Sequence, residues 1–234
     1  SQAALTRFAK KCGFKGYREF IFKYQQQKDA LTLLQPDMNP LTQRVLRSYT
    51  NLREMSRELI DEEQLERVAQ MIEQAERVYF FGTGSSGLVA REMKFRFMRL
   101  GVVCEAITDP DGFAWTTSIL DKNCLVFGFS LSGTTTSVID SLLDAQDMGA
   151  KTVLFTSMLS KETQDFTETV LVANQGQSPY IQRLSAQLPM LFVIDLLYAY
   201  FLEIDRESKE KIFNSYWENK KLNGYRRNRK NGKS

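Results

Sequence analysis

The sequence has 234 residues, 43% of them apolar and 25% charged, which excludes a collagen-like, coiled-coil or wholly disordered chain. Its length allows one or two domains with full hydrophobic cores. Histidine is absent, which excludes Ser-His-Asp catalysis, Cys-His catalysis and any metal centre ligated by histidine. The three cysteines (Cys12, Cys104 and Cys124) are far apart and form no C-x-x-C pair. We therefore expect no disulfide and no metal site, and a reducing, cytoplasmic location.

The charge is divided unevenly along the chain. Residues 1–28 and residues 217–234 each contain seven Lys or Arg residues and one acid, whereas the residues between them contain 17 bases and 26 acids. An acidic surface repels nucleic acid, so any contact with DNA would be made by one of the two ends. The simplest interpretation of the basic tail, 217–234, is a solvated and partly disordered segment over 219–234.

The first 75 residues predict only helices. Apolar residues at helical spacing predict a short helix over 1–12, ended by Gly13, and a second helix over 14–27. A segment with two prolines, 35–40, predicts a linker. Longer helical patterns follow over 41–59 and 61–75.

From residue 78 onward, apolar runs typical of buried strands alternate with helical patterns. Strands are predicted at 78–81, 102–107, 124–129, 152–156 and 169–173. The helices between them end at Arg99 and Met148, and an apolar helix over 182–202 closes the fold. This alternation predicts an α/β fold, a parallel sheet with helices on both faces.

The closing helix is too apolar to be exposed, so we expect it in the core or in a dimer interface. Its longest apolar run, 188–202, is shorter than a membrane span, and no membrane partner is expected. The run is also interrupted by Asp195, which we expect to be hydrogen-bonded.

Two strand-to-helix loops carry the polar chemistry. The first, Gly82-Thr83-Gly84-Ser85-Ser86-Gly87, matches the dinucleotide-binding pattern G-x-G-x-x-G, with Glu105 where such sites place their ribose-binding acid. In the second, 130–137, seven of eight residues are glycine or carry a hydroxyl group, directly before a helix. Such a helix N-terminus favours an anion such as phosphate, whereas a simple helix cap needs only one hydroxyl. A sugar-phosphate site explains both loops, and a dinucleotide site explains only the first.

The element S-x-S-G-x-T at 130–135, paired with G-x-G-x-S at 82–86, resembles the sugar isomerase (SIS) domain over roughly 65–203. The resemblance implies a five-stranded parallel sheet in a three-layer αβα fold that binds phosphosugars without a cofactor or metal. We assign this domain to 65–216. The resemblance implies ligand contacts from eight residues, two of them through backbone amides: Gly84, Ser85, Ser86, Ser130, Leu131, Ser132, Gly133 and Thr135.

Residues 1–20 are similar to the recognition helix and the following helix of RpiR-type regulators. In that family of bacterial regulators of sugar catabolism, a helix-turn-helix domain precedes an SIS domain. The resemblance implies the end of a DNA-binding domain at 1–34, a helical linker at 35–64, and a dimer or tetramer on an operator. It implies base or groove contacts from Ser1, Gln2, Ala3, Thr6 and Arg7, and phosphate contacts from Lys10, Lys11 and Lys15.

The chain departs from this family pattern in three places. It begins within the region similar to the recognition helix, so we expect the preceding helices to lie outside this sequence. Segment 109–113 lacks the histidine often found in relatives, which leaves the effector open. The basic residues at 217–234 have no counterpart in the pattern.

Two other functions remain open from the sequence. An SIS-fold isomerase would use Glu92 or Glu105 as its base, and it would convert a phosphosugar that a regulator releases unchanged. A dinucleotide-binding protein would use Gly82, Gly84, Gly87 and Glu105.

Overall fold

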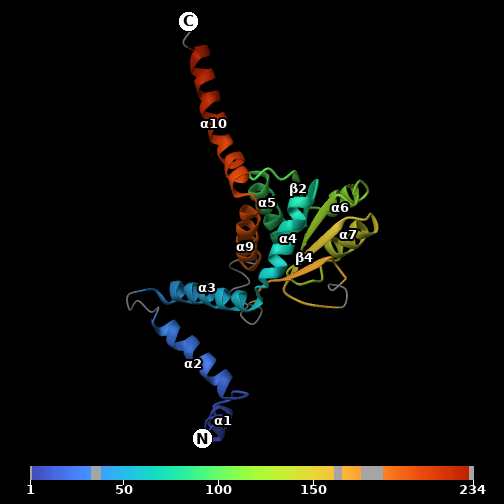
Figure 1. Ribbon diagram of the computed structural model, residues 1–234. Coiled ribbons are helices and arrows are strands. Elements are labelled where there is room, and N and C mark those ends of the chain that lie inside the picture. The colour runs from blue at the N-terminus through green and yellow to red at the C-terminus, as the bar shows by residue number, and fades with distance from the viewer. Residues whose placement is uncertain (1, 33–37, 161–164, 175–186, 232–234) are drawn as a thin grey trace. The chain divides into compact units, whose positions relative to one another are not determined.

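The computed structural model describes residues 2–32, 38–160, 165–174 and 187–231 (Figure 1). The chain divides into two compact units, Ser1–Asn51 and Leu52–Ser234. The predicted domain boundaries at 34/35, 64/65 and 216/217 stay predictions.

The first unit contains α1 (Gln2–Lys11), α2 (Tyr17–Thr32) and the beginning of α3 (Pro40–Leu59). The two predicted N-terminal helices are confirmed, although α2 begins later and ends later than expected. α1 packs on α2 through Phe20, whose ring centroid lies 5.4 Å from those of Phe8 and Phe14. Ala9 is buried, and Leu5 is exposed.

The second unit is built on a five-stranded sheet in the order β2-β1-β3-β4-β5. All pairings are parallel, and the strands are β1 (Arg77–Gly82), β2 (Cys104–Ile107), β3 (Cys124–Phe129), β4 (Lys151–Thr156) and β5 (Glu168–Leu171). The predicted sheet is confirmed, with small shifts at strand ends. The chain passes from β1 to β2 on one side and returns to β3 on the other side. In open parallel sheets, this switch point is where ligands bind, outside the carboxyl ends of the strands.

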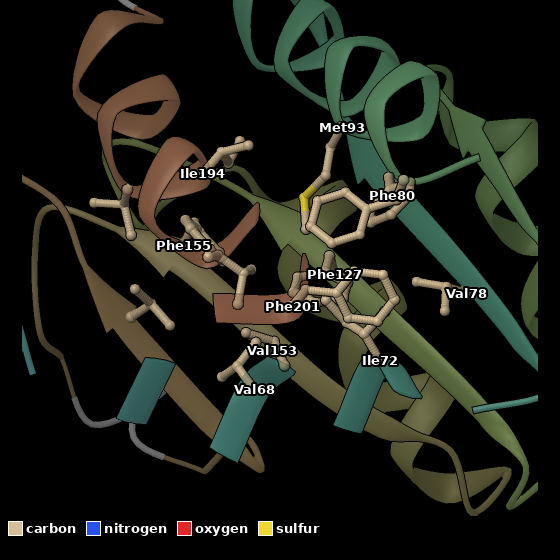
Figure 2. Close-up of a cluster of buried hydrophobic side chains, with 14 of the residues drawn as sticks. Val68, Ile72, Val78, Phe80, Met93, Phe127, Val153, Phe155, Ile194 and Phe201 are labelled. Carbon is tan, nitrogen blue, oxygen red and sulfur yellow. The ribbon is translucent and has the colours of Figure 1, made fainter. Parts of the chain in front are cut away.

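Helices cover both faces of the sheet, which confirms the three-layer αβα architecture. On one face lie α4 (Glu62–Gln74), α5 (Gly84–Met98) and α9 (Leu188–Ile204), and on the other lie α6 (Pro110–Thr117) and α7 (Thr136–Asp147). Alternate residues of β3 serve the two cores: Phe127 enters the first, and Val126 enters the second. Figure 2 shows the first core, to which Ile72 of α4, Met93 of α5, Phe127 of β3 and Phe201 of α9 contribute.

The closing apolar helix is confirmed as a core element. α9 begins at Leu188, and the predicted positions 182–186 lie outside the described residues. Its buried face includes Ile194 and Leu197. Among the described residues, no helix combines the length and hydropathy needed to cross a bilayer.

Two helices were not predicted. α6 begins with recognisable signals, because Asp109 accepts a hydrogen bond from the Gly112 N–H at 2.8 Å and Pro110 occupies the first turn. The second, α10 (Arg206–Asn231), continues through most of the segment expected to be a partly disordered tail. That expectation is wrong up to Asn231. Lys, Arg and Glu are good helix formers even where no apolar stripe is present.

Candidate functional site

The two predicted loops leave neighbouring strands at the switch point. β1 ends at Gly82 and β3 ends at Phe129, and these two residues are partners in the parallel ladder. Adjacent strands lie about 4.8 Å apart, so the loops start side by side. The first leads into α5 and the second into α7. The structure therefore brings both loops, and the N-termini of both helices, to one edge of the sheet.

The first loop depends on close backbone packing. A Cβ atom on Gly82 would lie 2.6 Å from the Ser86 carbonyl oxygen, so a side chain does not fit there. Ser85 and Ser86 lie in the first turn of α5, where backbone N–H groups have no acceptor within the helix. Ser85 is exposed and Ser86 is half-buried. Thr83, the N-cap residue, makes no side-chain hydrogen bond to its helix, which leaves the helix end open to an anion.

The second loop is held together by Ser130 and Thr135. Ser130 is buried, and its hydroxyl donates to Thr135 Oγ1 at 3.0 Å and accepts from the Thr135 N–H at 3.3 Å. The Ser130 carbonyl accepts from the Gly133 N–H at 3.0 Å, which closes a turn at the left-handed Gly133 (φ 68°). These two hydroxyls therefore shape the loop, a role that its Ser and Thr content alone did not reveal.

Ser132 has a different environment. It is exposed, its hydroxyl lies 2.9 Å from that of Thr134, and it accepts from the Thr134 N–H at 3.3 Å. Thr135, the N-cap residue of α7, makes no side-chain hydrogen bond to its own helix. An anion at this helix N-terminus would meet the helix dipole and the Ser132 hydroxyl.

Two residues near this edge were missed from the sequence. Ser157, just after β4, donates to the Leu131 carbonyl through its N–H at 3.0 Å and its hydroxyl at 2.6 Å. Thr108, just after β2, accepts from Arg91 Nη2 at 3.1 Å. Ser157 and Thr108 follow parallel strands at their carboxyl ends, and this position was the signal that could have identified them.

The carboxylates required by the alternative functions are paired with cations. Glu105 forms an ion pair with Lys94 of α5. Glu92 lies 2.6 Å from Arg96, which also pairs with Asp195 of α9 and so confirms the expected hydrogen bond of that aspartate.

Within the described ranges, no group of three or more Cys, Asp or Glu side chains is placed to hold a metal ion. Burial raises the pKa of Cys104 to about 11, so its thiol stays protonated at neutral pH.

The predicted DNA-contacting residues lie on and just after α1. Arg7, Lys10 and Lys11 are exposed and share one helix face through their three- and four-residue spacing. Thr6 is half-buried and Lys15 is exposed. Gln2 and Ala3 belong to α1, while Ser1 lies outside the described residues.

Comparison with known proteins supports this architecture. The family model of the SIS domain matches residues 71–200, more than half of the chain. An uncharacterized HTH-type transcriptional regulator of Haemophilus influenzae is 29% identical over 229 residues, which cover 91% of this chain and 80% of that protein.

Two solved structures show the same fold. The Vibrio vulnificus NanR protein, complexed with ManNAc-6P, has a TM-score of 0.69 at 23% identity. The alignment covers 93% of this chain and 80% of the NanR chain. The sugar isomerase domain of an RpiR transcription factor from Sphaerobacter thermophilus has a TM-score of 0.68 at 19% identity. The alignment covers 76% of this chain and 98% of that domain's chain. The names of other matched structures include sugar-phosphate isomerase. The chain belongs to the SIS domain family, and its relatives over about 90% of its length are HTH-type transcriptional regulators of the RpiR family.

Proposed function

We propose that this chain is a bacterial DNA-binding regulator of sugar metabolism whose SIS domain binds a sugar-phosphate effector at loops 82–87 and 130–137. The observation that carries the proposal is the pair of helix N-termini without side-chain caps at the switch point, flanked by glycine and hydroxyl groups. The effector contacts would come from Gly84, Ser85, Ser86, Ser130, Leu131, Ser132, Gly133 and Thr135.

The phosphate belongs at the second loop. The N-terminus of α7 offers backbone amides and the positive end of a helix dipole, and Ser132 adds an exposed hydroxyl. Ser130 and Thr135 would act mainly by fixing the loop, because their hydroxyls bond to each other. The sugar would then lie toward Ser85 and Ser86 of the neighbouring loop.

The relatives suggest which effectors to test first. NanR of Vibrio vulnificus is known as a complex with ManNAc-6P, and it aligns with 93% of this chain. Amino-sugar phosphates, N-acetylated and free, are therefore the first class of ligand to examine.

DNA is the second proposed partner, because the curated relatives are HTH-type regulators. The contacts would come from α1 and the turn that follows it, with Ser1, Gln2, Ala3, Thr6 and Arg7 at the bases and Lys10, Lys11 and Lys15 at the phosphates. A homodimer or tetramer in the cytoplasm would present two such helices to paired half-sites.

We propose binding without catalysis. A general base must reach the proton that it removes, and both Glu92 and Glu105 are already paired with cations. NMR spectra of a sugar phosphate incubated with the protein should show binding and no new sugar species. The same sugar phosphate should change the affinity of the intact regulator for its operator. Conversion to an isomer would favour the isomerase alternative, and stabilisation by NAD would favour the dinucleotide alternative.

A further inference from the structure

We propose that residues 217–231, the distal half of α10, form a second DNA-binding element that contacts the phosphate backbone without reading sequence. This proposal rests on the proposed function as a DNA-binding regulator. It adds a surface that lies outside the part of the chain matched by the SIS domain model, residues 71–200.

The proximal half of α10 is anchored, and two of its cations, Arg206 and Lys209, are paired with acids. Lys209 is buried, donates to Glu73 of α4 at 2.8 Å and lies 4.3 Å from the ring centroid of Phe201. Arg206 pairs with Glu203 at 3.2 Å and with Glu210 at 2.8 Å. These contacts fix the start of α10 on the SIS domain.

The distal half carries an excess of positive charge. It contains six Lys or Arg residues and a single acid, Glu218, so at least five positive charges cannot be neutralised within the segment. The rings contacted by Lys220, those of Tyr216 and Trp217, belong to the same helix. Lys221 and Trp217 are exposed. A polyanionic partner would supply the missing negative charge.

The distribution of these charges favours DNA over a membrane surface. In the sequence of this segment, six cations (Lys220, Lys221, Arg226, Arg227, Arg229 and Lys230) are interspersed with three apolar residues, Trp217, Leu222 and Tyr225. A helix that lies on a membrane needs a broad apolar face, and three apolar residues among fifteen do not supply one. Duplex DNA carries one charge per ~1.7 Å of its axis, and a helix of this length spans about 22 Å, so several phosphates lie within its reach.

The test compares two charge-matched triple variants of the chain. Lys221, Arg226 and Arg227 are changed to Gln in the first, which removes three distal charges but keeps good helix formers. In the control, the exposed Arg57, Lys122 and Lys151 are changed to Gln, which removes the same charge outside α10. Circular dichroism verifies that both variants keep their helix content.

The readout is the affinity for a fluorescent duplex of random sequence, measured by anisotropy as a function of salt. If all three residues contact phosphates, the log–log slope becomes shallower by about 2.7 in the distal variant and stays unchanged in the control. Between about 50 and 200 mM salt, the dissociation constant of the wild type should then rise about 40-fold more than that of the distal variant.

Several results would overturn the proposal. These are equal slopes in the wild type and the distal variant, an equal change in the control, or no binding of random duplex by the wild type. Charge-dependent binding to phosphatidylserine vesicles with no change in the DNA slope would assign the segment to membranes instead. Stabilisation by a sugar phosphate is measured in both variants and should persist, which separates failure of this inference from failure of the proposed effector site.

Discussion

The substitutions Ser132→Ala and Ser130→Ala should separate effector binding from loop stability. Both substitutions remove one serine hydroxyl from the same loop. Among the described residues, exposed Ser132 forms its side-chain hydrogen bonds with Thr134, whereas Ser130 is buried and makes two hydrogen bonds to Thr135. If the phosphate binds at the N-terminus of α7, the two changes have different costs.

The magnitudes follow from these environments. Loss of one donor to a charged phosphate costs about 1.5–3 kcal/mol, so Ser132→Ala should weaken sugar-phosphate binding about 10- to 150-fold. Its effect on folding should stay within about 0.5 kcal/mol, as for most surface changes. Ser130→Ala leaves the Thr135 N–H without its acceptor, which should cost about 1–3 kcal/mol of stability. For a unit of this size, that lowers the melting temperature by about 2–10 °C.

Two measurements on each variant test this separation. Isothermal titration calorimetry gives the affinity, and thermal unfolding without ligand gives the stability. Ser118→Ala is the control, because the hydroxyl of that exposed serine donates to the Trp115 carbonyl of α6, away from both loops. Unchanged affinity in Ser132→Ala would remove this hydroxyl from the site. A loss of stability in Ser132→Ala as large as that in Ser130→Ala would refute the assignment of separate roles.

Three further predictions concern the surrounding structure. Gly82→Ala should destabilise the protein by about 1–3 kcal/mol and weaken effector binding, because its Cβ would collide with the Ser86 carbonyl; unchanged unfolding would show that the loop relaxes freely. A hydrogen bond from the Asn123 backbone N–H lowers the pKa of Asp121. The ionised carboxylate therefore stabilises the fold at pH values above the ordinary Asp pKa. The difference in denaturation midpoint between the wild type and Asp121→Asn should shrink as pH falls below about 4, and a constant difference would contradict the linkage. With its pKa raised to about 11 by burial, Cys104 should resist maleimide at pH 8 while the exposed Cys12 reacts, and equal labelling rates would contradict that burial.

The elements with a strong apolar period were predictable from the sequence. The strand 124–129 was placed to the residue, because a continuous apolar run between polar turns fits a strand buried on both faces. Both loops were located, because glycine and hydroxyl residues interrupt the pattern where a strand ends. Each expectation came from local sequence, which periodicity and turn chemistry describe well.

What was missed depends on long-range contacts or lacks an apolar period. The distal half of α10 is rich in Lys and Arg and has no regular apolar spacing, so no periodic pattern predicted this helix. The bond between Ser157 and the Leu131 carbonyl joins residues 26 positions apart, and the pair of Arg96 with Asp195 joins residues 99 positions apart. Such contacts follow from strand order and helix packing, which no local pattern records.

A thermal-shift panel tests the central claim most directly. The full chain is heated with sugar phosphates, including ManNAc-6P and other amino-sugar phosphates, and with the matching unphosphorylated sugars and NAD as controls. We predict that one sugar phosphate stabilises the protein, by about 2.7 kcal/mol at 100 times its dissociation constant, and that its unphosphorylated sugar does not. Stabilisation by NAD, by the free sugar alone, or by none of the phosphate esters would contradict a phosphosugar site at the switch point of the sheet.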